Sequence, residues 1–255
     1  NKHPLKAPIG GKPNRKNQNI QAKAAAELRK RAEAAASSSQ ATNEKTFREI
    51  GVLRPVKSLV VMDQGDRDIC WAICFAGLTQ ALHNMTRPVN QHVEISIEEL
   101  INQIKPGASE SFGLANLKIA IKHIAKNGIL KQPAREKKSQ EANAVGTRYH
   151  ETFQLHQDVD ADFLQARLDR YPVALILQMD AEFLALGQDG IYHMRKKAPI
   201  TKDTSFHCML LIGYGVTREG KTFFIGQNSH GEEWGCKGYA IVFINNECDI
   251  FCRQD

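Results

Sequence analysis

The chain has 255 residues, enough for one large domain or two smaller lobes around a sizeable core. Hydrophobic residues make up 42% of the chain and charged residues 24%. This ordinary globular mix excludes a wholly disordered, collagen-like or coiled-coil protein. No apolar run approaches the roughly 18 residues that a membrane span requires, so we expect no such span.

The net charge of +6 belongs to the first part of the chain. Residues 1–50 hold 11 Lys and Arg against 4 Asp and Glu, whereas the other 205 residues hold 23 against 24. Because the basic excess lies in one segment, we expect no nucleic-acid site in the main domain. An acidic partner that binds this basic segment is left as an alternative.

Residues 1–46 contain no Phe, Trp or Tyr and few large aliphatic residues. Such a segment buries too little apolar surface to order itself, so we expect a basic, Ala-rich arm that is disordered or marginally helical. A helix that docks on a membrane surface or on a partner is the alternative, although apolar anchors for it are missing. The globular domain is predicted at residues 47–255.

The first half of this domain has the patterns of helices. A helix is expected to begin near Cys70, after a polar loop. Two more follow, the first capped by Ser96 with Glu99 three residues later, and the second ended by Gly128. We therefore predict a helical lobe at about residues 64–130.

The second half is rich in short β patterns, with one helix expected at residues 160–170. A β lobe is predicted at about residues 135–245, which makes the fold α+β with a cleft between two lobes. Four runs are expected to be strands: VALILQM, HCMLLIGYGV, KTFFIGQ and GYAIVFI.

A cysteine at the start of a helix is the first candidate for chemistry. At Cys70 the unpaired N–H groups and the dipole of the first helical turn favour a thiolate. A thiolate nucleophile also needs a base and a group that holds the base. His207 opens a predicted strand, and the Asn228 amide oxygen, 21 residues later, can accept its imidazole N–H. Gln64 offers an amide that can join the Cys70 N–H in an oxyanion hole.

Cys70 precedes His207 by 137 residues and Asn228 by 158, the order and approximate separation of papain-type enzymes. At these residues the sequence resembles the papain-like cysteine proteases, the cathepsin-type family, through the motifs QGDRDICWA, HCMLLIGYG and NSHGEEWGCKGY. The resemblance covers roughly residues 52–244. It implies a two-lobe α+β fold with a helical left lobe, a β-barrel-like right lobe and the active site in the cleft between them.

By this resemblance, Cys70 is expected to be the nucleophile, His207 the general base and then acid, and Asn228 the group that orients His207. Gln64 is expected to donate to the oxyanion during hydrolysis of protein or peptide substrates through a thioester, without cofactor or metal. The resemblance places further residues at the substrate or over the site: Gly113, Leu114, Ala115, Ile176, Ser205, Cys208, His230 and Trp234.

The sequence departs from the family pattern at several positions, among them Asp68-Ile69 in place of Gly-Ser and a missing partner cysteine before the Gly-Gly pair. Arg67 stands where the family has a disulfide cysteine, and Phe112 occupies the first glycine of its Gly-Gly pair. His230 replaces the Trp that shields the His–Asn hydrogen bond, and Phe206 replaces a small polar residue. We expect His230 to become cationic near pH 6.5 and to repel an imidazolium at His207. These departures leave open a catalytically weakened papain fold that serves as a binding or regulatory module.

An unrelated Cys–His hydrolase, such as a transglutaminase-like or amidase fold, fits the dyad but leaves Gln64 unexplained. Among the other thiols, Cys74 is expected in the core and Cys208 in the core or a pocket. Cys248 and Cys252 are expected in a near-terminal loop, with pairing or zinc binding as the alternative. We expect a monomer. The compartment stays open, because the family is usually lysosomal, vacuolar or secreted while the missing disulfide cysteines leave the cytoplasm open.

Overall fold

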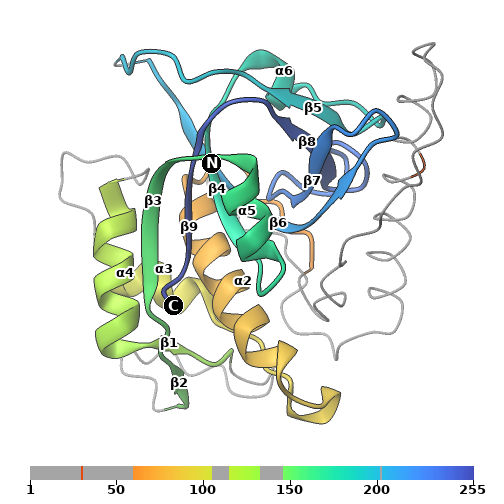
Figure 1. The fold of residues 1–255 in the computed structure, drawn as a ribbon. Coiled ribbons are helices and arrows are strands. Elements are labelled where there is room, and N and C mark those ends of the chain that lie inside the picture. The colour runs from red at the N-terminus through yellow and green to blue at the C-terminus, as the bar shows by residue number, and fades with distance from the viewer. Residues whose placement is uncertain (1–29, 31–59, 105–114, 133–145, 202) are drawn as a thin grey trace.

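The structure is a computed structural model that describes residue 30 and residues 60–104, 115–132, 146–201 and 203–255. The arm predicted at residues 1–46 lies outside these residues, apart from residue 30. The described chain has the predicted two-lobe α+β fold, with helices gathered on one side and a large sheet on the other (Figure 1). Within it, no helix is both long and apolar enough to cross a membrane.

The helical lobe contains three α-helices, one 3-10 turn and a small two-stranded sheet. Its main helix begins at the predicted residue, Cys70, and is buried along almost its whole length. In chain order the elements are α2 (Cys70–Met85), η1 (Val89–Gln91), α3 (Ile97–Gln103), α4 (Ala115–Asn127), β1 (Ile129–Leu130) and β2 (Arg148–Tyr149).

Only one of the two hydrogen bonds of the predicted capping box of α3 is present. Ser96 Oγ accepts a hydrogen bond from the Glu99 backbone N–H at 3.2 Å, as a helix N-cap does. The Ser96 N–H donates instead to Leu130 O. The Glu99 carboxylate accepts from the Leu130 N–H and from Arg148 Nη2, at 3.2 and 2.8 Å. The carboxylate that was expected to close the cap therefore joins α3 to the small sheet.

The large sheet has seven strands in the order β3-β9-β4-β6-β7-β8-β5. Neighbouring strands are antiparallel except β5 and β8, which are parallel. The strands are β3 (Phe153–Val159), β4 (Val173–Gln178), β5 (Ile191–Met194), β6 (Phe206–Val216), β7 (Thr222–Gln227), β8 (Tyr239–Ile244) and β9 (Cys248–Arg253), with helices α5 (Ala161–Leu168) and α6 (Ala181–Leu184) between them.

The prediction of a loop around Cys248 and Cys252 was wrong, because this segment forms strand β9. It lies between β3 and β4 and pairs with both. Cys248, Ile250, Phe251 and Cys252 are fully buried, and the pattern of consecutive apolar residues fits a strand covered on both faces. The short helix α6 was not predicted either.

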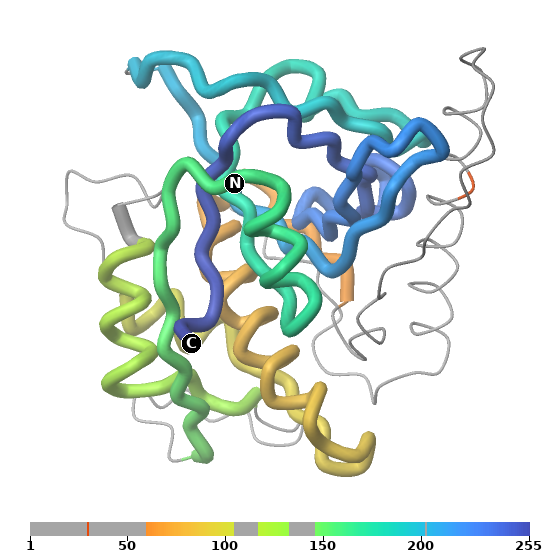
Figure 2. Tube along the Cα trace, in the orientation of Figure 1, coloured from red at the N-terminus to blue at the C-terminus, as the bar shows by residue number. Residues whose placement is uncertain are grey.

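Helix α2 packs on the sheet through one core that spans both lobes. The Phe75 ring lies 5.3 Å from the Phe153 ring on β3 and 4.3 Å from the Phe251 ring on β9, between centroids. The tube in Figure 2 shows the dark blue end of the chain running between β3 and the orange helix. Two buried polar side chains of α2 also fix it to the following segment: Asn84 exchanges hydrogen bonds with the Val93 backbone, and Gln80 Oε1 accepts from the Ile95 N–H.

All six cysteines are buried, and the structure places none of them in a disulfide. Arg67, at the position of a family disulfide cysteine, forms a two-pronged ion pair with Glu98 on α3, the closer contact being 2.9 Å. Both side chains are more than a third exposed, so this pair contributes at most about 1 kcal/mol. The stability of the described fold therefore rests on packing rather than on covalent bridges.

We expect a reducing agent to change the melting temperature of the freshly purified protein by less than about 2 °C. A structural disulfide contributes about 2–5 kcal/mol, which in a domain of this size corresponds to roughly 4–20 °C. The measurement is thermal unfolding with and without a phosphine reductant. A larger drop would contradict a fold without disulfides and would direct attention to a bridge at Cys236, Cys248 or Cys252.

Candidate active site

The first residue of α2 carries the candidate nucleophile. Cys70 is 8% exposed, so the protein encloses most of this residue. The next residue, Trp71, is buried and its indole N–H donates to Asp68 O at 3.1 Å, which fixes the loop that enters the helix. The helix start and this bond together determine where the Cys70 side chain points.

His207 and Asn228 come from neighbouring strands and meet beside Cys70. His207 is the second residue of β6, and Asn228 directly follows β7, whose last residue Gln227 pairs with Leu210. His207 Nε2 and Asn228 Oδ1 are 2.6 Å apart, and both side chains are buried. Since an amide oxygen only accepts, this bond puts the proton on Nε2 and leaves Nδ1 for the thiol.

The Cys70 thiol is acidified by its neighbours. A hydrogen bond from the Cys208 side chain holds the pKa of Cys70 well below its usual range, although burial opposes the shift. A hydrogen bond with His207, the charge of His207 and the Cys208 backbone N–H lower this pKa further. A lowered pKa increases the share of thiolate, the form that acts as a nucleophile.

Gln64 is held against the segment that follows Asn228. Its backbone N–H donates to Ser229 O at 2.8 Å. Two residues away on each segment, the Gly231 N–H donates to Met62 O at 2.9 Å. The Ser229 hydroxyl donates to Gln64 Oε1 at 2.6 Å, and Gln64 Nε2 donates to Arg67 O at 2.9 Å. These bonds fix the amide at the start of the loop that leads to Cys70.

Aromatic rings enclose the imidazole of His207. The His230 ring lies 4.6 Å and the Phe183 ring 5.4 Å from it, between centroids. The Trp234 ring packs on Phe183 at 5.0 Å, and its indole N–H donates to Phe183 O at 2.7 Å. Phe183, on α6, was missed by sequence reasoning, because a four-residue helix is too short to carry a periodic signal.

The expectation that His230 becomes cationic near pH 6.5 was wrong. Burial and the neighbouring His207 lower the pKa of His230 to about 4, although Cys70 and Asp63 oppose this. A partly buried imidazole beside another imidazole is more stable neutral than charged. His230 is therefore a neutral ring beside His207 over the range in which most enzymes work.

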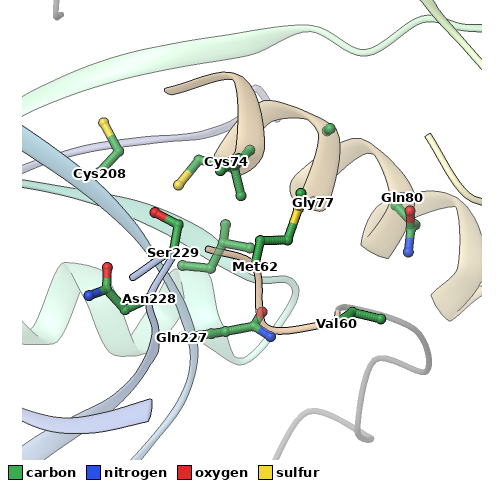
Figure 3. Close-up of a pocket in the computed structure, with 12 residues that line it drawn as sticks. Val60, Met62, Cys74, Gly77, Gln80, Cys208, Gln227, Asn228 and Ser229 are labelled. Carbon is green, nitrogen blue, oxygen red and sulfur yellow. The ribbon is translucent and has the colours of Figure 1, made fainter. Parts of the chain in front are cut away.

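The residues predicted at the substrate are brought together only in part. Ile176 on β4 and Cys208 on β6 are partners in register, and Ser205, just before β6, is exposed. Cys74 and Cys208 line one cavity with Asn228 and Ser229, between α2 and the ends of the strands (Figure 3). Ala115 begins α4, while Phe112, Gly113 and Leu114 lie outside the described residues.

The described residues contain no group of three His, Cys, Asp or Glu side chains arranged to hold a metal ion. Cys248 and Cys252 lie on β9, where burial raises the pKa of both thiols, to about 12 and about 11. A thiol must lose its proton to bind zinc, so this strand is a poor place for such a site.

Comparison with known proteins shows to which family the chain belongs. The model of the papain family cysteine proteases matches residues 47–253. The chain belongs to the papain family of cysteine proteases. Its papain-family relatives include cathepsin M of Mus musculus, 24% identical, and cathepsin 7 of Rattus norvegicus, 26% identical, each match covering 80% of this chain and 62% of the relative. The chain thus spans about three fifths of the length of these relatives.

Solved papain-family structures share the fold. A structure from a study of the mite allergens Blo t 1 and Der p 1 matches with a TM-score of 0.62 at 19% identity, covering 90% of this chain and 82% of that one. Bromelain from Ananas comosus, solved with an inhibitor, matches with a TM-score of 0.57 at 17% identity, covering 76% and 92%. At these identities the likeness establishes the fold.

We expect the neutral state of His230 to make the folded protein less stable in acid. The unfolded chain binds a proton at this residue as pH falls through about 6.5, whereas the folded protein does so only near pH 4. Because the unfolded state binds more protons in this window, stability falls as pH falls. Between about pH 7 and about pH 5, the wild type should lose on the order of 1 kcal/mol more than His230→Gln.

The measurement is urea unfolding at both pH values, with exposed His150→Gln as the matched control. Equal acid losses in the wild type and His230→Gln would show that His230 titrates alike in both states. That result would support the initial expectation of a cationic His230 beside His207.

Proposed function

We propose that this papain-family chain is a peptidase that uses Cys70, His207 and Asn228 to hydrolyse peptide bonds, with Gln64 as oxyanion donor. The observation that carries the proposal is the 2.6 Å bond between His207 Nε2 and Asn228 Oδ1, next to a thiol whose pKa is held low. A nucleophile, a base within reach and a group that orients the base form the minimal set for thiol catalysis.

The steps follow from the positions of these groups. The Cys70 thiolate attacks the scissile carbonyl carbon, and the oxyanion is stabilised by the Cys70 N–H and Gln64 Nε2, whose other hydrogen is held by Arg67 O. The His207 imidazolium gives its proton to the leaving amine, which leaves a thioester on Cys70. His207 then takes a proton from water, and the resulting hydroxide releases the acid product and restores the thiolate.

Asn228 acts through His207 rather than on the substrate. Its Oδ1 fixes the ring so that Nδ1 faces the nucleophile during both proton transfers. The two rings next to His207, Phe183 and His230, exclude water from part of this bond, which strengthens it.

A weakened papain fold that serves as a binding module is the second candidate. The observation that favours it is His230, whose imidazole is smaller than the indole that it replaces by resemblance. The acidified thiol favours the peptidase, because a pure binding module gains nothing from holding a buried cysteine as a thiolate.

We expect Cys70→Ser and His207→Ala each to lower kcat/KM for a fluorogenic peptide by at least about 10³-fold, because the nucleophile and base act as a unit. Gln64→Ala should cost about 10²-fold, as loss of one oxyanion donor does. Gln165→Ala, a glutamine on α5 away from the site, is the matched control and should leave kcat/KM unchanged.

Circular dichroism must show that each variant is folded. An epoxysuccinyl inhibitor should label the wild type at Cys70 and fail to label Cys70→Ser. Wild-type turnover by the Cys70→Ser variant, or a folded wild type that neither cleaves peptides nor takes the label, would leave the binding module as the better reading.

We expect an apolar side chain to be preferred two residues before the scissile bond. The pocket inferred for it from the resemblance contains no charged residue, and Ile176 and Cys208 lie side by side in it. A peptide library is the measurement. Strong selection of Arg or Asp at that position would reject this pocket, whose other inferred members are Leu114, Ala115 and Ser205.

A further inference from the structure

Asp63 carries an exposed carboxylate at the edge of the proposed active site. It directly precedes Gln64, and its backbone pairs with that of His230 in an antiparallel bridge. Asp63 Oδ1 accepts a hydrogen bond from the Gly65 backbone N–H at 2.9 Å, which orients the side chain. Among the residues that the structure describes, Oδ2 has no partner. This oxygen is therefore available to a ligand.

The space beside this carboxylate is left open by Gly231. The glycine has a φ of +78°, the left-handed conformation that other residues rarely adopt. A Cβ at this position would lie 3.5 Å from Asp63 Oδ2, and its three nearest atoms would all belong to the Asp63 side chain. A side chain there would cover the carboxylate, so the glycine keeps it accessible.

The segments around Asp63 and Gly231 carry acidic residues and no Lys or Arg. Hydrogen bonds hold three such segments together, since the Gly231 N–H donates to Met62 O at 2.9 Å and the Trp234 indole N–H donates to Phe183 O at 2.7 Å. The acidic residues of the segments 61–66, 180–190 and 229–235 are Asp63, Asp66, Asp180, Glu182, Asp189, Glu232 and Glu233.

The nearby basic residues neutralise only part of this charge. Arg195 pairs with Asp180 and Glu182, at 3.2 and 3.5 Å. Arg67 pairs with an acidic residue of α3, away from these segments. Lys237 is exposed and forms no ion pair within the described chain. The carboxylates nearest to His230 in sequence and in contact therefore stay negative.

His230 supplies a ring between two of these carboxylates. It pairs with Asp63 through the backbone and precedes Glu232 by two residues. Its imidazole is partly exposed, and burial together with His207 lowers its pKa to about 4, so the ring is neutral near pH 7. Lys and Arg side chains lay their methylene stems on such surfaces while their charged heads reach polar groups. A neutral ring flanked by carboxylates suits both parts of a long basic side chain.

The proposed reaction decides which part of a substrate meets this ring. His207 gives its proton to the leaving amine, so that nitrogen must lie within hydrogen-bond reach of the imidazole. The acyl part stays on Cys70 and extends toward the inferred pocket at Ile176 and Cys208. The residue that carries the amine therefore lies on the other side of His207, where His230 is 4.6 Å away between ring centroids.

We propose that Asp63 and Glu232 make the enzyme prefer peptide bonds that are directly followed by Lys or Arg. The stem of that side chain lies along the His230 ring, and its charged head meets the two carboxylates. The preference rests on the proposed function, because proton transfer from His207 defines the leaving-amine side. It adds a basic residue after the scissile bond to the apolar residue expected two positions before it.

The experiment uses quenched fluorescent peptides that are identical except directly after the scissile bond, where they carry Lys, Gln or Glu. The wild type is compared with Asp63→Asn, Glu232→Gln and the double variant. Asp162→Asn, an exposed acidic residue on α5, is the matched control. Because Asp63 adjoins Gln64, the quantity compared is the ratio of kcat/KM for the Lys and Gln peptides, in which a general loss of activity cancels.

We expect the wild type and Asp162→Asn to favour the Lys peptide over the Gln peptide by about five- to tenfold, with the Glu peptide cleaved most slowly. One exposed ion pair contributes up to about fivefold, and two carboxylates act on the same side chain. The ratio should fall in each single variant and approach one in the double variant. It should also shrink in about 0.5 M NaCl, which screens exposed charges.

Peptide hydrolysis by the wild type with a Lys-to-Gln ratio near one would overturn this preference and leave the proposed function standing. A high ratio that persists in the double variant would assign the preference to other groups and also reject the proposal.

A wild type that hydrolyses none of the peptides would instead reject the proposed function. Fluorescence anisotropy with the Cys70→Ser variant then tests recognition without hydrolysis. Tighter binding of the Lys peptide that disappears when Asp63→Asn and Glu232→Gln are added would support recognition by the carboxylates, and equal binding of all three peptides would reject it.

Discussion

The docking of helix α2 on the sheet is the constraint on which the rest of the site depends. The helix is buried along almost its whole length, and Asn84 and Gln80 bond the backbone that follows it. A helix held in this way cannot slide or rotate without losing apolar contacts and leaving buried polar groups unpaired. Cys70, its first residue, is therefore held beside the sheet by packing and by these hydrogen bonds, before any substrate is present.

The electrostatics of the site follow from that placement. At the helix start the Cys70 sulfur meets His207 and Cys208, two consecutive residues of one strand, and both act to lower its pKa against the opposing effect of burial. His230, which faces the same imidazole, shifts toward its neutral form. The same neighbours thus lower the pKa of the Cys70 thiol and keep the His230 ring neutral.

Much of this was available in the sequence. The sequence was enough to predict the start of α2 and the cap at Ser96, because helix periodicity and capping depend on neighbouring residues. The order of Cys70, His207 and Asn228 could be read from the spacing of the motifs. The roles of those residues remain predictions, which the geometry supports. The effect of Cys208 on the pKa of Cys70 could not be predicted from the sequence, since it depends on how a helix and a strand dock. The position of the Phe183 ring beside His207 also depends on tertiary packing and could not be predicted. The lowered pKa of His230 could not be predicted either, because it depends on partial burial.

Strand β9 went unseen for a related reason, and its position has a consequence for how the protein is made. Phe251 on β9 packs on Phe75 of α2, 176 residues earlier in the chain, and β9 lies between β3 and β4. Contacts this distant in sequence form late, because closing the long intervening loop costs entropy before the contact repays it. While the chain emerges from the ribosome, the sheet stays split and one face of α2 uncovered until residues 248–253 are available. The support behind Cys70 is therefore complete only once β9 has been synthesised, so the thiol is not held in its final position on a nascent polypeptide that lacks this strand.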